Sequence, residues 1–496
     1  MKRYIYLLLL LFCSSCGDIL DVVPENSVTF TNYFQTEQDL VAIVNSIHHS
    51  LRGNELALAE REMIGWIIDD VNTEEVYYAR DWGAPYYLND ETSVVWSGFY
   101  QGIIYNSNLL LDNAYRVENI KPERLELYLQ QAYFAKGFAY FRVAQNWGDA
   151  PIVQNSTDTR PLAKSPVGKV LDEALKYALK AFDLPKFEDL KDENGAAITF
   201  KQYASKGAAT ALLAHIYAWR AALENNIKYW EEAEKYCSLI IDGKVGSYSL
   251  ASNPEEVCTK VLARNSQESI WELQVDRIDD PLFLYTPYAI CQYLGYPIVP
   301  GAVPTDYHYV ELTKETVRQL YGKNDLRINA YFFGMDSTFV EAENKIFINK
   351  WRYPIYEESE WSDYPLLKGI DVNRIVWRLA DIMLLRAECR VRLGQADAVE
   401  DLNSIRARAG VSAYDPAEGD LRYMIFRERE RELIYEGTRF YDVVRNGYWK
   451  TELPEAFSRL TEEDIKNGAL YFPVGSNAFF LNDLMLQNTY WLTQQK

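Results

Sequence analysis

A run of small and apolar residues between Pro122 and Trp147 constrains the fold more than any other feature of the sequence. One face of this segment repeats at steps of 4, 3, 3, 4 and 4 residues, through Leu125, Leu129, Ala132, Ala135, Ala139 and Val143. This spacing predicts a helix, and Pro122 and Gly148 stand where helices commonly begin and end. Because alanine lets a neighbouring helix approach closely, the sequence predicts tightly packed helix pairs.

A second small-residue face lies in residues 206–223, and other segments also have apolar residues at helical spacing. The further predicted helices are residues 36–51, 94–115, 230–241, 313–321, 374–393, 396–408 and 421–437, and β-like runs occur at 269–275 and 345–351. Paired helices with alanine at their contacts are typical of tetratricopeptide-like hairpins, although no regular period of about 34 residues is present. We therefore expect a mainly α fold, a tetratricopeptide-like helical hairpin scaffold with long loop-rich insertions and a few short strands.

The N-terminal segment is typical of an export signal. Two basic residues precede an apolar stretch, residues 4–12, and two serines stand directly before Cys16. About 20 apolar residues are needed to span a bilayer, so this shorter stretch predicts a signal peptide over residues 1–15. The segment resembles a bacterial lipoprotein signal, which implies acylation of Cys16 and an extended, lipid-anchored leader over residues 16–35. A redox CxxC pair of Cys13 and Cys16 is the alternative, and no βαβ pattern around it supports that interpretation.

The charge balance excludes one class of partner. The chain has 51 Lys and Arg against 71 Asp and Glu, a net charge of −20, and no long basic run. A protein that binds DNA or RNA needs clustered cations to neutralise phosphates. Nucleic acid is therefore not an expected partner.

Four cysteines lie beyond the signal, at positions 237, 258, 291 and 389. They show no CxxC spacing and no histidine at metal-ligand spacing, and three disulfide pairings are open to them. We expect most of them to be buried free thiols. The sequence predicts no metal site and no cofactor.

Residues 427–432 alternate arginine and glutamate. On a helix this places like charges four residues apart, where they repel each other, so these side chains need partners on other helices. The expected partners are Arg378, Arg406 and Arg408 for the glutamates, and Asp381 and Glu388 for the arginines. Structural ion pairing is the favoured interpretation, with ligand binding by this cluster as the alternative.

Several strings in the chain, taken in order, resemble the SusD/RagB family. They are Trp-Gly-Asp-Ala-Pro at 147–151, Arg-Leu-Ala-Asp-Ile-Met-Leu at 378–384, Leu-Asn-Ser-Ile-Arg-Ala-Arg-Ala-Gly at 402–410, Glu-Arg-Glu-Arg-Glu-Leu at 428–433 with Glu-Gly-Thr-Arg-Phe-Tyr-Asp at 436–442, and Phe-Pro-Val at 472–474. The resemblance runs from the lipoprotein signal to the C-terminus. Each string alone is weakly specific, whereas the ordered set is specific.

The resemblance implies an outer-membrane lipoprotein of Bacteroidetes on the extracellular face of a SusC-like TonB-dependent transporter. Such proteins are built on tetratricopeptide-like helices and capture a nutrient, most often a glycan, without catalysis. The expected function is therefore capture of an oligosaccharide or polysaccharide for delivery to that transporter. The alternative is an oligopeptide-binding lid of a peptide-importing transporter, since some members of the family serve peptide import.

The expected organisation is one SusD-like helical domain over residues 36–496. Its parts would be an N-terminal helical part (36–245), a loop-rich insertion (246–370) and a C-terminal helical part (371–496). Long loops are where binding residues usually lie. The resemblance agrees, because the family's ligand platform is commonly built from the segment before the helix that begins near Trp96 together with the mid-chain insertion.

Aromatic residues are concentrated in three windows, residues 77–105, 283–296 and 347–364. Flat rings stack on the apolar faces of sugars, while nearby polar side chains bind hydroxyl groups. Trp82 lies in a turn-forming stretch, which favours an exposed ring, whereas Trp96, Tyr100, Ile103 and Trp147 are expected in the core. The expected ligand contacts are Asp70, Arg80, Trp82, Tyr86, Tyr288, Tyr296 and Trp351, with Trp361 as a weaker candidate.

An enzyme is the competing class of function. The two Asp-Asp pairs, at 69–70 and 279–280, could supply the carboxylates of a glycoside hydrolase, but adjacent residues seldom face each other across a substrate. The four histidines form no HExxH motif, and there is no G-x-S-x-G motif or phosphate-binding loop. The sequence therefore favours a binding protein.

Overall fold

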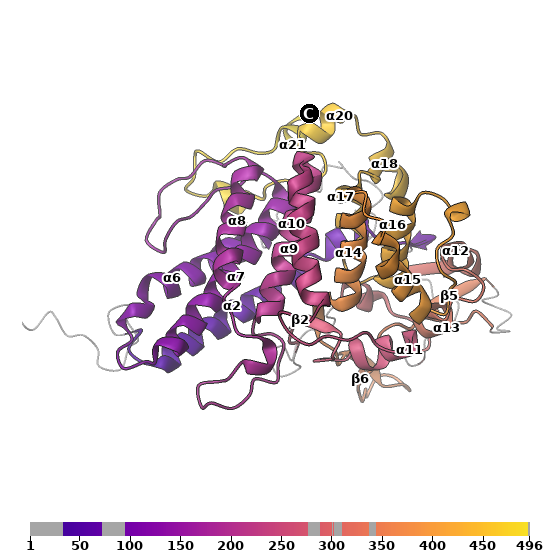
Figure 1. Ribbon diagram of the computed structural model, residues 1–496, viewed down its shortest axis with the longest axis horizontal. Coiled ribbons are helices and arrows are strands. Elements are labelled where there is room, and N and C mark those ends of the chain that lie inside the picture. The colour runs from indigo at the N-terminus through magenta and orange to yellow at the C-terminus, as the bar shows by residue number, and fades with distance from the viewer. Residues whose placement is uncertain are drawn as a thin grey trace, which may run out of the picture.

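The computed structural model describes residues 33–71, 95–275, 288–299, 301, 310–336 and 344–494. Within these residues the chain is mainly helical, with few short strands, as the sequence predicts. Figure 1 shows long helices packed side by side, from α2 and α7 across α9 and α10 to α14, α15 and α16. No helix among the described residues combines the length and the apolar composition that crossing a bilayer requires.

The N-terminal helical part contains most of the long helices. Its helical elements are α2 (Glu37–Ala57), α3 (Ala59–Ile64), the π-helix η3 (Gly98–Ile104), α6 (Tyr105–Asn113), the short η4 (Ala114–Arg116), α7 (Pro122–Trp147), α8 (Val167–Ala181), the short η5 (Phe187–Asp189), α9 (Lys206–Glu224) and α10 (Ile227–Ile241). The bounds of α7 are those that its small-residue face predicts. Helix α8 is absent from the predicted set, although its buried residues Val170, Leu171, Ala174 and Ala178 follow helical spacing.

Helices α7 and α8 approach each other closely at a glycine. A Cβ atom at Gly137 would lie 2.9 Å from the backbone nitrogen of Ala178 and 3.1 Å from the carbonyl oxygen of Ala174. The α9–α10 hairpin packs beside this pair, and α10 in turn contacts α14 although the whole insertion separates them in sequence. The predicted scaffold of helical hairpins is therefore present, with small residues at its contacts.

The C-terminal helical part completes the scaffold. Its helices are α14 (Leu379–Arg392), α15 (Ala398–Arg408), η9 (Pro416–Glu418), α16 (Leu421–Glu432), α17 (Arg439–Asn446), α18 (Trp449–Glu452), α19 (Glu455–Ser458), α20 (Glu462–Lys466), η10 (Ser476–Phe479) and α21 (Thr489–Gln494). Three predicted boundaries are wrong. Residues 374–378 form strand β8 instead of the start of α14, α16 ends at Glu432 and not at residue 437, and α2 continues to Ala57 and not only to residue 51. The segment Arg-Ile-Val-Trp-Arg is rich in residues that favour strands, and it pairs antiparallel with β2 (Ser269–Leu273).

In its described residues, the predicted insertion contains more strands than the two β-like runs of the sequence. A four-stranded antiparallel sheet has the order β1 (Asp70–Val71), β3 (Val310–Thr313), β5 (Lys345–Ile348), β4 (Phe332–Phe333), and β6 (Pro354–Glu357) pairs with β7 (Leu366–Ile370). Its helical segments are α11 (Pro254–Glu256), η6 (Val257–Val261), η7 (Ala289–Tyr293), α12 (Lys314–Leu320) and α13 (Arg327–Tyr331). In Figure 1, α11, α12, α13, β5 and β6 lie at the right and lower right, near α15 and α16.

Two hydrophobic cores hold the structure together. The larger core fills the helical scaffold and includes Trp96, Ile103 and Trp147, as expected; the Tyr100 ring packs against it half-buried. The second core belongs to the insertion, and Met63, Trp66, Ile434 and Tyr435 join it from the scaffold. The four predicted thiols are free and buried, at Cys237, Cys258, Cys291 and Cys389.

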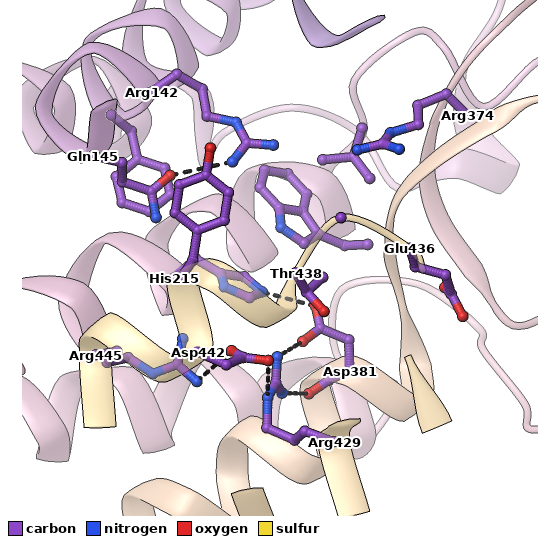
Figure 2. Close-up of a pocket in the computed structure, with 15 residues that line it drawn as sticks. Arg142, Gln145, His215, Arg374, Asp381, Arg429, Glu436, Thr438, Asp442 and Arg445 are labelled. Carbon is purple, nitrogen blue, oxygen red and sulfur yellow. Dashed lines mark hydrogen bonds and ion pairs between the residues drawn. The ribbon is translucent and has the colours of Figure 1, made fainter. Parts of the chain in front are cut away.

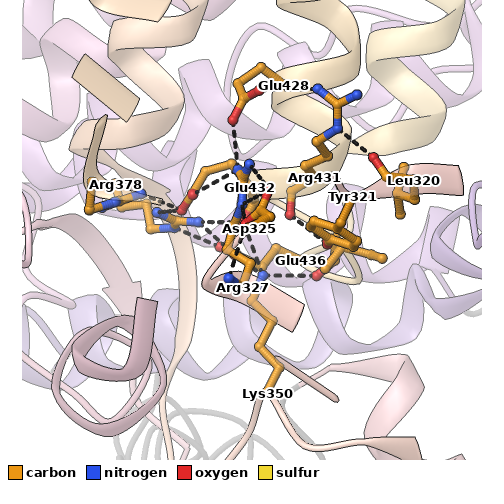
Figure 3. Close-up of polar contacts among 12 residues, drawn as sticks. Leu320, Tyr321, Asp325, Arg327, Lys350, Arg378, Glu428, Arg431, Glu432 and Glu436 are labelled. Carbon is orange, nitrogen blue, oxygen red and sulfur yellow. Dashed lines mark hydrogen bonds and ion pairs between the residues drawn. The ribbon is translucent and has the colours of Figure 1, made fainter. Parts of the chain in front are cut away.

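The charged run of α16 makes buried ion pairs with neighbouring elements (Figure 3). Glu432 lies 2.8 Å from Arg378, 2.5 Å from Arg408 and 3.5 Å from Arg327. Burial alone would raise the pKa of the Glu432 carboxyl, but these three guanidinium groups hold it far below its usual range. The expectation that Arg378 and Arg408 pair with the glutamates is confirmed.

Two of the five residues expected to pair with the charged run of α16 pair with other residues instead. Asp381 does pair with Arg429, at 2.6 Å, but Arg406 pairs with Glu418 at 2.9 Å. Glu388 accepts two hydrogen bonds from Arg445 of α17, at 3.0 and 2.7 Å. The sequence pattern shows that partners are needed, whereas the packing of α17 and of the 415–418 turn decides which of them are in reach.

His48 gives a specific pH dependence. It is buried on α2 with its ring 4.9 Å from that of Tyr203, and burial lowers the pKa of His48 from 6.5 to about 4. The unfolded chain therefore binds the proton more readily, so the stability that His48 contributes is intact above pH 6.5 and is lost as the pH falls toward 4. The loss reaches about 3 kcal/mol at pH 4.

Replacing His48 with leucine should remove this part of the pH dependence. Urea unfolding at pH 7 and pH 4 measures it. A His49→Leu variant is the matched control, because His49 is the exposed neighbour on the same helix and its loss should leave the dependence in place. Equal pH dependence in wild type and His48→Leu would contradict the assignment.

Candidate ligand-binding surface

One face of the four-stranded sheet carries half-buried aromatic rings. Phe333 of β4 stands opposite Phe347 of β5 in the antiparallel register. The ring of Tyr296 packs against both, with centroid distances of 5.4 Å to Phe333 and 5.8 Å to Phe347. The next cross-strand pair, Phe332 and Ile348, is buried in the insertion core. Strand alternation thus buries one face of the sheet and leaves rings on the other.

The β6–β7 hairpin extends this aromatic region. The Tyr356 hydroxyl donates a hydrogen bond to the carbonyl oxygen of Ile298, at 2.7 Å. The ring of Tyr364 covers Gly301, where a Cβ atom would lie 2.5 Å from the ring. Trp361, between the two strands, has 95% of its surface exposed.

These rings lie in one region, because Tyr296 packs against the sheet, while Ile298 and Gly301 contact Tyr356 and Tyr364 of the hairpin. We call it the aromatic surface and define it as Tyr296, Phe333, Phe347, Tyr356, Trp361 and Tyr364. An exposed tryptophan beside further exposed rings is uncommon on a surface that binds nothing.

Polar side chains surround the aromatic surface. Exposed carboxylates lie in the turn between β6 and β7, at Glu358, Glu360 and Asp363. Lys368 pairs with Glu357 across the hairpin. Carboxylates accept and ammonium groups donate hydrogen bonds, so the surface offers both kinds of partner to hydroxyl groups next to the rings.

The structure places the predicted contacts in three different environments. Tyr296 belongs to the aromatic surface. The prediction that Tyr288 and Trp351 contact the ligand is wrong, because both side chains are fully buried in the insertion core, with ring centroids 5.0 Å apart. The Tyr288 hydroxyl oxygen also accepts a hydrogen bond from the backbone nitrogen of Ile375, at 3.0 Å. A ring enclosed on all sides offers no face to a sugar.

Asp70 is the first residue of β1 and pairs in register with Glu311 of β3. Its neighbour Asp69 accepts hydrogen bonds from the backbone nitrogen of Thr313, at 2.6 Å, and from the Thr316 hydroxyl. This carboxylate therefore fastens the edge strand to the start of α12. Arg80, Trp82, Tyr86 and the predicted lipidation residue Cys16 lie outside the described residues.

Sequence reasoning missed several members of the aromatic surface. Phe333 lies outside the three predicted windows, and Tyr356 and Tyr364 were inside a window without being singled out. The strand alternation Lys-Ile-Phe-Ile over 345–348 could have marked Phe347, because it separates a buried face from an accessible one.

A second polar site lies within the scaffold (Figure 2). Arg429 lies 2.6 Å from Asp381 and 3.0 Å from Asp442, and the His215 ring nitrogen is 2.9 Å from Asp381. The cavity between them has a volume of about 40 Å³, which admits a few water molecules and no sugar ring. In the described part of the chain, no group of three or more His, Cys, Asp or Glu is arranged to hold a metal ion.

A helical hairpin scaffold that holds an inserted unit with exposed aromatic rings defines a class of α-helical ligand-binding proteins. Two family models match successive parts of the chain. Residues 18–218 match a family described as "Starch-binding associating with outer membrane", and residues 295–491 match the SusD family. Together the two matches identify the chain as a protein of the SusD family, and the description of the model that matches residues 18–218 associates that part with the outer membrane.

Individual relatives agree along nearly the whole length. SusD-like protein P2 of Formosa agariphila is 24% identical over 499 residues, covering 90% of this chain and 91% of the relative. A SusD homologue of known structure from Bacteroides thetaiotaomicron has a TM-score of 0.76 at 23% identity, covering 92% of this chain and 99% of that one. A laminarin-binding SusD-like protein has a TM-score of 0.69 at 19% identity, covering 92% and 99%. None of these names describes an enzyme.

Proposed function

We propose that this protein is a non-catalytic surface lipoprotein that captures oligosaccharide or polysaccharide and delivers it to a SusC-like TonB-dependent transporter. Acylation of Cys16 would anchor it in the outer membrane, on the extracellular face. The observation that carries the proposal is the aromatic surface, in which Trp361 exposes almost its entire side chain. A large flat ring in water, flanked by carboxylates, suits the apolar face and the hydroxyl groups of a sugar.

The aromatic surface stands on a rigid support. Phe333 and Phe347 belong to paired strands, and the sheet rests on the insertion core. A preorganised platform binds with a smaller loss of conformational freedom than a loose loop does. We also retain Asp70, Arg80, Trp82 and Tyr86 as proposed contacts, because Asp70 pairs with the strand next to β5 in this sheet and the other three follow it in sequence.

Substituting Trp361 tests the proposal. Trp361→Ala should weaken glycan binding about tenfold, because an exposed aromatic contact of this kind contributes about 1–2 kcal/mol, while Trp361→Phe should retain part of it. The glycan is first identified on a glycan array screened beside a peptide library. The variants are then compared with wild type by titration calorimetry.

Tyr115→Ala is the matched control, since Tyr115 is an exposed aromatic residue of the N-terminal helical part. Its affinity should equal that of wild type. Unchanged glycan binding by Trp361→Ala would contradict the assignment of the aromatic surface. Binding to peptides, with no binding on the glycan array, would show that the ligand is an oligopeptide and not a glycan. New reducing ends after incubation with the bound glycan would contradict a non-catalytic role.

A further inference from the structure

A second hollow lies in the scaffold, away from the aromatic surface. It has a volume of about 510 Å³ and lies where α9, α14 and α17 end and where α18 and α20 pack; Figure 1 shows α17, α18 and α20 together at the upper end of the view. Among its lining residues are Trp219, Trp230, Arg392, Arg422, Trp449 and Tyr471. Its volume is that of small-molecule sites, and no member of the aromatic surface lines it.

Two arginines of this hollow are held side by side at Asn446. The Arg392 Nη2 atom donates to the Asn446 side-chain oxygen at 2.8 Å, and the Arg422 Nη2 atom donates to the Asn446 carbonyl oxygen at 3.0 Å. Among the described residues, Arg422 has no carboxylate within ion-pair distance, and no hydrogen-bond acceptor is present for the Nη1 atom of either arginine. Guanidinium groups fixed at a common point, with free donors, are suited to a ligand that supplies acceptors.

The positive charge here is only partly neutralised. Glu388 lies 3.4 Å from Arg392, but it already accepts two hydrogen bonds from Arg445. Asp442, the other acid near Arg445, also pairs with Arg429. This leaves a local cationic site in a chain whose net charge is −20.

Asp420 is the other carboxylate in the neighbourhood. It lines an adjoining hollow that shares both arginines, and it accepts a hydrogen bond from the backbone nitrogen of Tyr423 as the N-cap of α16. Burial lowers the pKa of Arg392, and the charges of Arg422 and Arg445 act in the same direction, against Glu388. An arginine that is crowded by other cations gains from an anion nearby.

The walls of the hollow are aromatic. The Arg392 guanidinium lies 4.3 Å from the centre of the Trp230 ring, and Trp449 lies half-buried on the wall. The Nε1 atoms of Trp219 and Trp449 are buried without an acceptor among the described residues. The unpartnered polar side-chain atoms that these residues contribute are therefore donors, which favours a ligand that supplies acceptors.

We infer that this hollow is a binding site for a small organic carboxylate, whose ring lies against the indoles and whose anionic group accepts from Arg392 and Arg422. The site does not depend on the proposed glycan capture at the aromatic surface. An acidic monosaccharide and an aromatic acid share this chemistry, and the test distinguishes them.

Tryptophan fluorescence titrations with D-glucuronate, benzoate and D-glucose test the site at constant ionic strength. Saturable binding of glucuronate or benzoate, at least about tenfold tighter than that of glucose, supports it, because a charge-assisted hydrogen bond is worth about that factor. Which anion binds identifies the kind of ring. Absence of binding by both anions in the wild type overturns the inference, and so does equal binding of glucose in Trp361→Ala protein, which lacks the exposed tryptophan of the aromatic surface.

Two variants place the binding in this hollow. Arg422→Gln should lower the affinity for the bound anion about tenfold. Arg160→Gln removes an arginine with 77% of its side chain exposed, and it should leave that affinity unchanged. Trp361→Ala should also leave it unchanged, which keeps this result separate from that of the aromatic surface. Full affinity in a folded Arg422→Gln protein, with a wild-type melting temperature, would overturn the assignment.

Discussion

Replacing Glu432 with alanine is expected to lower the free energy of unfolding by about 3–5 kcal/mol. The Glu432 side chain is 1% exposed and faces three arginines, Arg327, Arg378 and Arg408. Removal of the carboxylate leaves these guanidinium groups buried with less compensation, and the cost of an unpaired buried charge exceeds the value of the pair itself. Chemical denaturation of wild type and variant measures the difference.

The matched control removes one partner of a solvent-exposed ion pair in the same protein. Glu232 of α10 lies 2.8 Å from Lys235, and 39% of its side chain is exposed, so Glu232→Ala should cost less than about 0.5 kcal/mol. Glycan affinity of folded Glu432→Ala should stay close to that of wild type. A loss of affinity at unchanged stability would instead show that the charged run binds ligand.

Introducing leucine at Gly137 is expected to cost about 3 kcal/mol of unfolding free energy. Even a single Cβ atom there would lie 2.9 Å from backbone of α8, so a larger side chain must push α7 and α8 apart. The separation would loosen contacts along both helices, because interiors are packed at crystal-like density. Thermal and urea unfolding both measure the loss.

A substitution at Gly53 is expected to change the unfolding free energy in the opposite direction. Gly53 is an exposed residue of α2, and a Cβ atom there would meet nothing within 4 Å. Gly53→Ala should therefore stabilise the protein by about 0.5–1 kcal/mol, because alanine is the better helix former. Equal destabilisation by Gly137→Leu and Gly53→Ala would contradict the close approach of α7 and α8.

The helical scaffold could be predicted because its signal is local. The small-residue face of α7 specifies both the helix and its close neighbour, and the bounds of α7 follow from Pro122 and Gly148. Strand β8 could not be separated from α14 in the same way, because apolar residues continue from Ile375–Trp377 into the start of α14 without a Gly or Pro between them. Its pairing with β2 depends on residues about a hundred positions away.

The ligand surface could be predicted only as regions. Composition places aromatic residues in the insertion, but Tyr288 and Tyr296 are alike in sequence and differ in burial. Tyr288 lies within the second core, whereas Tyr296 packs half-buried against Phe333 and Phe347. Which ring reaches water is decided by how Tyr296 packs against Phe333 and Phe347 and how Ile298 contacts Tyr356 of the β6–β7 hairpin. These contacts join segments that are tens of residues apart in the chain.

The buried ion pairs around α16 also join the inserted unit to the scaffold. Arg327 and Lys350 come from the insertion, whereas Glu428, Glu432 and Glu436 come from the C-terminal part. The hairpin that carries Trp361 lies at the exposed side of that unit, and none of these ion pairs involves it. Under the proposed role of the aromatic surface, substitutions in the hairpin would alter ligand preference while the ion pairs that attach the unit stay in place.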